Sequence, residues 1–280
     1  MKSFADKVAA ITGAGSGMGR TLAVALARRG CHVAVSDINE DGLAETATLA
    51  AAHGVKVTSR RVDVAKRDQV YPWADEVVRD HGRCNLVFNN AGVGHSSTIE
   101  GVEYADFEWI VGINFWGVVY GTKAFLPHLK ASGEGHVVNT SSLFGLVGIP
   151  SQGTYNATKF AVRGFTEALR EELEVTRSSV SATCVHPGGI KTNIARSARM
   201  DPSLKHLGVK DLEKTRSSFE KMFRVTAEDA AETILRGVQR NARRVLIGAD
   251  AHFLDALQRL MPGSYQGIVV AAARRTIERG

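Results

Sequence analysis

The chain has 280 residues, of which 44% are hydrophobic and 23% charged, so it can bury one large core. Its three cysteines are odd in number and irregularly spaced, which argues against a disulfide framework and for free thiols in a reducing compartment. The net charge is +6, but the basic residues of the second half alternate with acidic ones, so we expect no nucleic-acid partner.

Short apolar runs alternate with helical stretches along the chain, a pattern typical of βαβ units and of a parallel sheet covered on both faces. The predicted strands are Val8–Thr12, His32–Ser36, Lys56–Val62, Leu86–Asn89, His136–Thr140, Ser179–Val185 and Arg244–Ile247. We therefore expect an α/β fold with one doubly wound parallel sheet of about seven strands, in a single domain over residues 1–280.

Three kinds of segment are not expected. The longest uncharged apolar stretch, around Ile110 to Thr122, is too short to span a bilayer, so we expect no integral membrane segment. The first strand begins near residue 7, which leaves no room for a signal peptide, and we expect a cytoplasmic protein. The nine histidines show no paired ligand spacing, so we expect no metal site.

The first predicted strand runs into a glycine-rich segment, Gly13-Ala14-Gly15-Ser16-Gly17-Met18-Gly19, and a helix follows. A strand, a glycine-rich turn and a helix form the context in which such a segment binds phosphate. Glycines let the backbone approach a pyrophosphate closely, and the helix N-terminus presents free N–H groups and a positive dipole. The alternative is an ordinary tight turn, so a dinucleotide site needs further support.

The second predicted strand ends at Asp37, about 20 residues past the glycines. At this position an acidic residue binds the ribose hydroxyls of adenosine in dinucleotide-binding proteins. The strand-end position and the spacing agree with each other. They favour ribose binding over the alternative that Asp37 caps the next helix.

Tyr155 and Lys159 lie four residues apart in a predicted helix, so their side chains share one face of it. A lysine ammonium near a phenol favours the phenolate, and we expect it to lower the pKa of Tyr155 toward neutrality. A phenol tuned in this way exchanges protons with an alcohol or carbonyl oxygen. The pair alone does not establish a catalytic site, because Tyr and Lys at this spacing are common on solvated helix faces.

Together these segments resemble a classical short-chain dehydrogenase/reductase, and the resemblance extends over residues 12–192. In chain order, the matching segments are Thr12-Gly13-Ala14-Gly15-Ser16-Gly17-Met18-Gly19, Asp63-Val64, Asn89-Asn90-Ala91-Gly92, Asn114, Ser142, Tyr155-x-x-x-Lys159 and Pro187-Gly188-Gly189-Ile190-Lys191-Thr192. The resemblance implies a Rossmann-type fold that binds a nicotinamide dinucleotide.

The resemblance implies a catalytic set of Asn114, Ser142, Tyr155 and Lys159. In the family the tyrosine is the general acid/base, and the lysine lowers its pKa and holds the nicotinamide ribose. The serine orients the substrate oxygen, and the asparagine anchors a water of a proton relay. Ser141 is an alternative candidate for the catalytic serine, but the spacing of thirteen residues before Tyr155 selects Ser142.

The resemblance also implies a set of cofactor contacts: Gly13, Ser16, Gly17, Met18, Gly19, Asp37, Asp63, Val64, Asn90, Ala91, Gly92, Tyr155, Lys159, Pro187, Gly188, Ile190 and Thr192. We expect NAD rather than NADP, because Asp37 would repel a 2′-phosphate. Ser16 and Ile38 stand where NADP-preferring relatives carry basic residues. Arg20 is near enough to keep NADP open.

The expected substrate is a bulky or hydrophobic secondary alcohol or ketone. Residues 143–149 are almost wholly apolar, and residues 193–223, the family's variable loop, mix apolar residues with charges as a mobile lid does. Packing on the core or on a second subunit is the alternative for these apolar residues. Residues 250–280 form a predicted helical extension that could close the pocket, cover a neighbouring subunit or touch a membrane surface.

Three functions stay open, and the first is favoured: a NAD-dependent alcohol dehydrogenase or ketone reductase, an NADPH-dependent reductase of an oxoacyl or related carbonyl intermediate, and a non-catalytic dinucleotide-sensing protein. The last is disfavoured because Tyr155, Lys159 and the glycines are all present. We also expect a homo-oligomer, a tetramer or otherwise a dimer. It would pair through helices near residues 106–130 and 154–176, which carry more apolar residues than one sheet face needs.

Overall fold

Seven strands form one parallel sheet in the structure, a computed structural model that describes residues 1–221 and 223–278. The strands are β1 (Val8–Thr12), β2 (His32–Asp37), β3 (Val57–Arg61), β4 (Leu86–Asn89), β6 (Gly135–Thr140), β7 (Val180–Pro187) and β9 (Arg244–Ile247). Each predicted strand is present, with ends within two residues of the expected ones. The predicted doubly wound α/β sheet is therefore confirmed.

The order of the strands fixes where a ligand can bind. It runs β3-β2-β1-β4-β6-β7-β9, so the chain builds outward in opposite directions from β1 and from β4. The segments that leave these two central strands diverge at the carboxyl edge of the sheet. In open α/β sheets the ligand crevice lies at this switch point.

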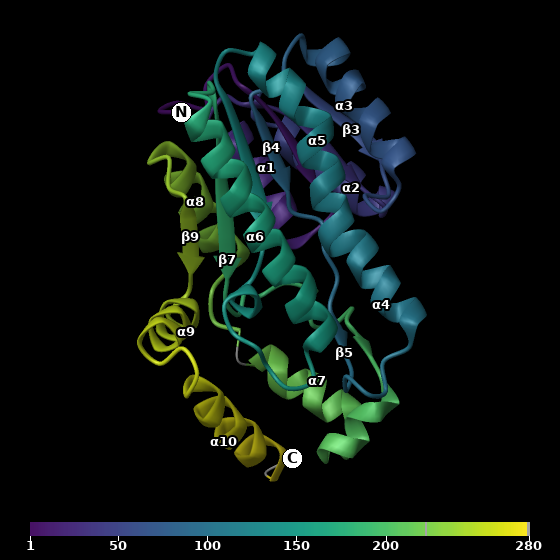
Figure 1. The fold of residues 1–280 in the computed structure, drawn as a ribbon. Coiled ribbons are helices and arrows are strands. Elements are labelled where there is room, and N and C mark those ends of the chain that lie inside the picture. Colours follow the sequence, from purple (N-terminus) through teal and green to yellow (C-terminus); the bar gives the residue numbers. More distant parts are fainter. Residues whose placement is uncertain (222, 279–280) are drawn as a thin grey trace.

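Helices cover both faces of the sheet, because successive residues of each strand point to opposite sides. Ala9 and Ile11 of β1 pack with α1 (Gly17–Ala27), α2 (Glu40–Ala51) and α8 (Ala227–Gln239). Val8 and Ala10 pack instead with α3 (Arg67–His81), α5 (Gly117–Ala131) and α6 (Gly153–Val175). Figure 1 shows α5 and α6 crossing the front of the sheet, with α1 behind it.

The helix expected near residues 106–130 is present but is not uniform. It begins as α4 (Tyr104–Val111), passes through a π-helical turn at Gly112–Trp116 and continues as α5. π-helical turns are often found at functional sites, because they shift the side chains of one turn. The expected catalytic residue Asn114 lies in this turn and is fully buried.

The predicted lid is a folded segment below the carboxyl edge of the sheet. Its strand β8 (Arg199–Met200) pairs with β5 (His95–Ser96), and a 3₁₀ turn at Pro202–Leu207 leads to α7 (Leu212–Lys221) (Figure 1). Leu204 is buried, so at least this apolar residue anchors the segment. Met222 and the side chain of Phe219 lie outside the described part of the chain.

The C-terminal extension forms the two predicted helices, α9 (Ala249–Leu260) and α10 (Tyr265–Glu278). Ala251 and Tyr265 pack on Leu143, Leu146 and Val147, the apolar residues that follow Ser142. These residues are therefore committed to packing against the extension. Of the two readings of residues 143–149, the structure favours packing for these three.

The three cysteines are buried and unpaired, as their spacing suggested. Burial raises the pKa of the Cys184 thiol to about 12, so this residue is a core residue and not an activated nucleophile. Across the described residues, none of the helices has the length and apolarity that crossing a bilayer requires.

Candidate active site

The glycine-rich segment makes a tight turn between β1 and α1. Gly13 and Gly17 have φ values of +65° and +51°, in the left-handed region that favours glycine. At the start of α1, Ser16 makes no side-chain cap bond, and the first turn of the helix carries no acidic residue. The N–H groups at this helix end and its positive dipole therefore suit an anionic ligand such as a pyrophosphate.

Asp37 lies beside this turn at the end of β2. Its Oδ2 accepts a hydrogen bond from the Gly15 N–H at 2.8 Å, and its Oδ1 accepts one from the Asn39 N–H at 2.9 Å. The residue that caps α2 is Asn39, whose side chain accepts from the Gly42 N–H. The helix-cap reading of Asp37 is therefore wrong, and its carboxylate faces the glycine-rich turn.

Arg20 is engaged by protein groups through all three of its guanidinium nitrogens. It donates to the carbonyl oxygens of Gly15 and Gly42, at 2.5 and 3.2 Å, and to the Thr46 hydroxyl at 3.0 Å. It also forms an ion pair with Glu45 at 2.8 Å. Arg20 thus braces the glycine-rich turn against α2, and a 2′-phosphate would have to compete with these partners.

The segment after β4 lies against the glycine-rich turn at the switch point. The Asn90 Nδ2 donates to the carbonyls of Thr12 and Gly13, and the Thr12 hydroxyl accepts from the N–H groups of Asn90 and Ala91. The Asn90 Oδ1 is buried and has no hydrogen-bond partner among the described residues. A β-carbon at Gly92 would lie 3.5 Å from the Lys159 Nζ, so this segment leads from the glycine-rich turn to Lys159.

The segment after β7 closes the other side of the glycine-rich turn. A β-carbon at Gly17 would lie 3.1 Å from the Thr192 Cγ2, so Thr192 faces the start of α1. Pro187 ends β7, and the Gly188 N–H donates to the Ile247 carbonyl of β9. The Ile190 side chain, for which the family resemblance implies a contact to the nicotinamide, is buried in the core with α1 and α8.

Asp63 and Val64 follow β3, where the family resemblance implies contacts to adenine. The Asp63 Oδ1 accepts from the Ala65 N–H at 3.0 Å, and Val64 is buried against Gly117 of α5. These contacts position the loop, and adenine binding by the two residues stays a prediction. Met18 packs on the core, and Ser16 is exposed at the N-terminus of α1.

Ser142, Tyr155 and Lys159 come together just past the carboxyl ends of β6 and β7. The Ser142 Oγ accepts from the Phe144 N–H at 3.1 Å and forms a hydrogen bond with the Tyr155 side chain. The Lys159 Nζ lies 5.5 Å from the centre of the Tyr155 ring and donates to the Thr140 carbonyl at 3.0 Å. Tyr155 and Lys159 thus share a face of α6, as their spacing predicted.

Ser141 has a different place from its neighbour. Its hydroxyl donates to the Lys159 carbonyl at 2.7 Å, which ties the end of β6 to α6. Ser142, and not Ser141, is therefore the serine beside Tyr155.

The pKa of Tyr155 moves in the direction opposite to the expected one. Burial raises the pKa of Tyr155 to about 12, and the Ser142 hydrogen bond offsets only part of this shift. Burial also lowers the pKa of Lys159 to about 8. The prediction that Lys159 brings the Tyr155 pKa toward neutrality is thus wrong for the protein alone, because desolvation of the phenolate outweighs the lysine.

The Asn114 side chain is bound on both sides to a neighbouring loop. Its Oδ1 accepts from the Val93 N–H at 2.8 Å, and its Nδ2 donates to the Val93 carbonyl at 2.9 Å. The Nδ2 also lies 3.4 Å from the Thr158 hydroxyl, next to Lys159. Asn114 therefore braces the segment after β4, and its role in a water relay stays a prediction.

Asp250 contributes to the site, and the sequence analysis missed it. Its Oδ2 accepts from the Gly189 N–H at 2.7 Å, so the start of α9 holds the Pro187-Gly188-Gly189 segment. A β-carbon at Gly188 would lie 2.1 Å from the Asp250 Oδ1, which leaves room only for glycine there. The sole signal in the sequence was an acidic residue at a helix start.

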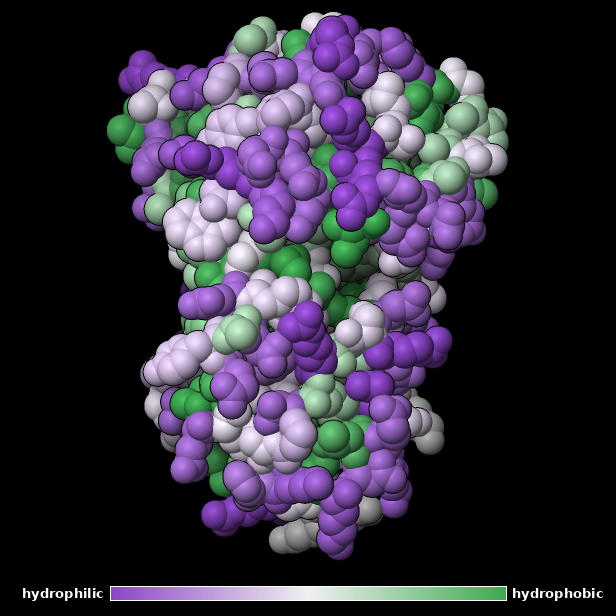
Figure 2. Space-filling model, turned by 90° about the vertical axis from the view of Figure 1, so that its right-hand side faces the viewer, coloured by the Kyte–Doolittle hydropathy of each residue, from purple (hydrophilic) through white to green (hydrophobic). Residues whose placement is uncertain are grey.

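Two hollows lie close in the chain to the expected site residues, but Ser142, Tyr155 and Lys159 do not line either of them. One, of about 610 Å³, is lined by Lys191, Thr192, Asn193, Arg196, Glu220, Phe223 and Arg224. The other, of about 400 Å³ and mostly apolar, lies between residues 148–153 and α10. Figure 2 shows a waist on one face of the molecule with hydrophobic side chains inside it. No group of side chains suited to holding a metal ion occurs in the described part of the chain.

Comparisons with known proteins point to one family for this chain. The family model described as short chain dehydrogenase matches residues 7–203. "Putative oxidoreductase SadH" of Mycobacterium tuberculosis is 49% identical over 98% of both chains. "C alpha-dehydrogenase" of a Sphingobium strain is 32% identical over 94% of this chain and 89% of its own. A crystal structure of a short-chain dehydrogenase/reductase from Burkholderia phymatum in complex with NAD is 30% identical, with a TM-score of 0.84 over 97% of both chains.

Proposed function

Because this chain belongs to the short-chain dehydrogenase/reductase family of oxidoreductases, we propose that it transfers a hydride between NAD(H) and a secondary alcohol or ketone. One observation carries the proposal. A buried lysine, a serine and a tyrosine meet at the carboxyl edge of the sheet, beside the segments expected to bind the dinucleotide. Proton exchange at an oxygen and dinucleotide binding would then occur in one crevice.

The residues at the switch point fit a nicotinamide dinucleotide. The uncapped start of α1 would hold the pyrophosphate, and Asp37 would accept from the adenosine ribose hydroxyls. The buried Asn90 Oδ1, without a partner among the described residues, and the Lys159 ammonium lie on the path toward the nicotinamide end. When bound, the nicotinamide supplies or accepts the hydride at the carbinol carbon.

The chain's own residues would handle the proton. In ketone reduction, the Tyr155 hydroxyl donates its proton to the substrate oxygen as that oxygen gains negative charge. In alcohol oxidation, the Tyr155 phenolate takes the hydroxyl proton. Ser142 would hold the same oxygen through its hydroxyl, and the Lys159 ammonium would stabilise the phenolate. The pKa of about 12 keeps Tyr155 protonated at neutral pH, which suits it to the reductive direction.

NAD is favoured over NADP by two residues. The Asp37 carboxylate would repel a 2′-phosphate, and Arg20, the cation that kept NADP open, is bound through all its nitrogens to protein groups. The solved relative from Burkholderia was crystallised with NAD. These observations support NAD as the cofactor of this chain.

A bulky or hydrophobic substrate is supported by the surroundings of Tyr155. The Phe144 ring lies edge-on to the Tyr155 ring, with 6.0 Å between their centres. The mostly apolar hollow along α10 begins at residues 148–153, which join the Ser142 segment to α6. The Sphingobium relative is named a dehydrogenase, which agrees with oxidation of an alcohol.

The test is a screen of secondary alcohols and ketones with NAD(H) and NADP(H), repeated with Tyr155→Phe. We expect turnover of at least one bulky alcohol–ketone pair with NAD(H). The Phe variant should lose on the order of 100-fold or more in kcat, because it lacks the acid/base hydroxyl. It should keep NADH binding, followed by fluorescence. Tyr71→Phe, on the surface of α3, is the matched control and should leave kcat unchanged.

The outcomes separate the candidate functions. A Phe variant with kcat within tenfold of the parent would remove Tyr155 from the acid/base role. Turnover of an oxoacyl compound with NADPH alone would establish the NADPH-dependent reductase. NADH binding without turnover of any compound would favour the dinucleotide-sensing protein.

A further inference from the structure

The ladder between β6 and β7 ends one residue before Ser142. The Ser141 N–H donates to the Val185 carbonyl at 2.8 Å, the last bond of this ladder. The next bond of a parallel ladder would come from the N–H of residue 187. That residue is Pro187, which has no N–H to donate. Backbone pairing therefore cannot fix the position of Ser142.

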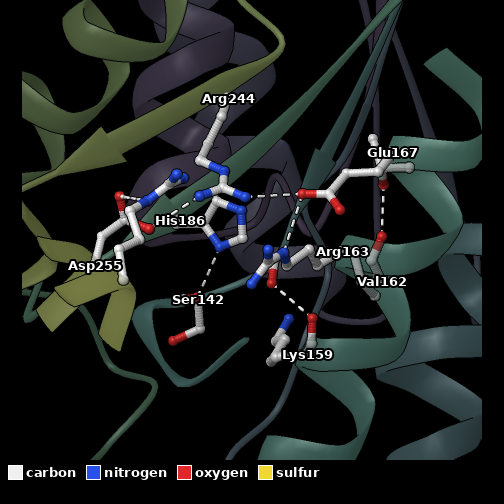
Figure 3. Close-up of polar contacts among 11 residues, drawn as sticks. Ser142, Lys159, Val162, Arg163, Glu167, His186, Arg244 and Asp255 are labelled. Atoms are coloured by element: carbon white, nitrogen blue, oxygen red, sulfur yellow. Dashed lines mark hydrogen bonds and ion pairs between the residues drawn. The ribbon is translucent and has the colours of Figure 1, made fainter. Parts of the chain in front are cut away.

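At this point a side chain of β7, and not its backbone, forms the hydrogen bond to the segment that follows β6. The His186 Nδ1 lies 2.9 Å from the Ser142 carbonyl oxygen (Figure 3). The same oxygen accepts from the Gly145 N–H at 2.9 Å, which closes the 3₁₀ turn after Ser142. His186 thus ties the turn that carries Ser142 to the rigid strand β7.

The hydrogen bond fixes which nitrogen of His186 carries the proton. A carbonyl oxygen can only accept, so the Nδ1 must be the donor. The ring is fully buried, and its Nε2 has no hydrogen-bond partner among the described residues. Burial, together with the charges of Arg244 and Arg163, lowers the pKa of His186 to about 4. The ring therefore stays neutral at physiological pH, and its one polar contact in the described part of the chain is the one to Ser142.

An ion network holds the elements around this ring. Arg244 of β9 pairs with Glu167 of α6 and with Asp255 of α9, both at 2.9 Å. Arg163 pairs with the same Glu167 at 3.0 Å. In Figure 3 the His186 ring lies between this network and Ser142. The network joins β9, α6 and α9 on the side of the ring away from Ser142.

We propose that His186 is a positioning residue, which holds Ser142 at the correct distance from Tyr155 through the hydrogen bond from its Nδ1. This role rests on the proposed function, because it matters for catalysis only if Ser142 and Tyr155 act on the substrate oxygen. The Ser142 side chain is bonded to the Phe144 N–H and to Tyr155. A shift of the Ser142 backbone would disturb both of these contacts.

Two amide substitutions test the role, because each mimics one nitrogen of the ring. His186→Asn places an N–H donor near the position of the Nδ1, whereas His186→Gln places it near the position of the Nε2. We expect the Asn variant to keep kcat within about threefold of the parent. The Gln variant should lose on the order of tenfold or more in kcat, since small displacements of a positioned group are costly. NADH affinity should change by less than about threefold in both, because neither His186 nor Ser142 has a hydrogen bond to the glycine-rich turn or to Asp37 in the described part of the chain.

Kinetics would be measured with the fastest alcohol–ketone pair of the screen, and folding by urea unfolding of each variant. Nitrogen-15 NMR of histidine-labelled parent protein would report the His186 tautomer without any need for turnover, with the signal assigned by its loss in the Asn variant. We expect a proton on the Nδ1 and none on the Nε2 between pH 6 and about 9.

Each outcome decides for or against the role. A folded Asn variant that loses as much kcat as the Gln variant overturns it, as does a Gln variant with parental kcat. A proton on the Nε2 overturns it even if the Gln variant does not fold. If the parent shows no turnover that depends on Tyr155, the proposed function fails and the catalytic role fails with it. The tautomer would still show in that case whether the contact to Ser142 exists.

Discussion

The carboxylate of Asp37 lies 2.8 Å from the backbone nitrogen of Gly15, so one residue both braces the glycine-rich turn and faces the expected ribose. The two roles predict different results for two substitutions. Asp37→Asn keeps an acceptor for the Gly15 N–H but removes the charge, whereas Asp37→Ala removes both.

We expect Asp37→Asn to weaken NADH and to bind NADPH better than the parent does. The ratio of the two affinities should change by on the order of tenfold or more, the worth of one charge-assisted hydrogen bond. Asp37→Ala should weaken both dinucleotides, since the turn loses its brace. Fluorescence titration with NADH and NADPH measures both effects. A parent protein that prefers NADPH would contradict this reading of Asp37.

The shifted pKa values of Tyr155 and Lys159 predict how the rate depends on pH. Burial raises the pKa of Tyr155 to about 12 and lowers the pKa of Lys159 to about 8. Ketone reduction needs the neutral phenol and the charged lysine, so its kcat should be level below about pH 7 and fall as pH rises through the lysine pKa. Alcohol oxidation needs the phenolate and should become faster toward alkaline pH. Rate profiles from pH 6 to about 10 check both directions. A reduction rate that stays level over this range would show that the Lys159 charge is not required.

Buried histidines such as His136 and His186 make the fold sensitive to acid. Burial lowers the pKa of His136 to about 3 and that of His186 to about 4, from an ordinary value near 6.5. The unfolded chain therefore binds more protons than the folded one below pH 6.5, so stability is lost as pH falls from about 6.5 toward 4. Each histidine should cost on the order of 2 kcal/mol at pH 5.

Urea unfolding at pH 7 and pH 5 measures this loss. His186→Asn removes one of these titrating groups, so it should reduce the difference between the two pH values by on the order of 2 kcal/mol. An equal difference in parent and variant would mean that His186 is already charged in the folded protein.

The strands and the catalytic cluster could be predicted from the sequence because their signals are local. Apolar runs gave all seven strands, and a spacing of four placed Tyr155 and Lys159 on one face of α6. Contacts between distant segments gave no such signal. Asp250 reaches Gly189, and His186 reaches Ser142, only because the sheet brings β7, β9 and the ends of β6 together. The Tyr155 pKa was mispredicted for a related reason. Its direction depends on burial by the whole fold, and not only on the neighbouring lysine.

An aromatic surface on the helical layer predicts a homo-oligomer. Trp116 stacks on Tyr120 and lies near Phe115, which contacts Phe165 of α6. Trp116 and Phe160 are 45% and 40% exposed, a large apolar area to leave in water. Val119 of α5 and Leu169 of α6 are instead buried in the chain's own core.

We expect a tetramer, or otherwise a dimer, by light scattering at micromolar concentration, and a smaller assembly for Trp116→Glu. Phe253→Glu, at a more exposed aromatic residue of α9, is the matched control and should not change the mass. A monomeric parent would refute the interface.

Within the predicted lid, the residues before Leu204 are held by more contacts than the residues after it. Before this residue, Arg199 pairs with Asp106 at 2.6 Å and lies 3.6 Å from the centre of the Trp109 ring, and β8 pairs with β5. After it, Leu207 and Leu212 are only partly buried, and most of α7 is exposed. We therefore expect residues 209–221 to open readily and residues 199–204 to stay in place.

Hydrogen exchange with and without NADH plus a ketone tests this division. Residues 209–221 should exchange fast in the free protein and more slowly when both ligands bind, because closure excludes water from the hydride path. Residues 199–204 serve as the internal control and should be protected in both states. Leu207→Ala should raise KM for a bulky ketone more than for a small one, since it removes apolar surface from the closed lid. Strong protection of residues 209–221 that does not change with ligand would make this segment a fixed wall of the pocket, and Leu207 an ordinary packing residue.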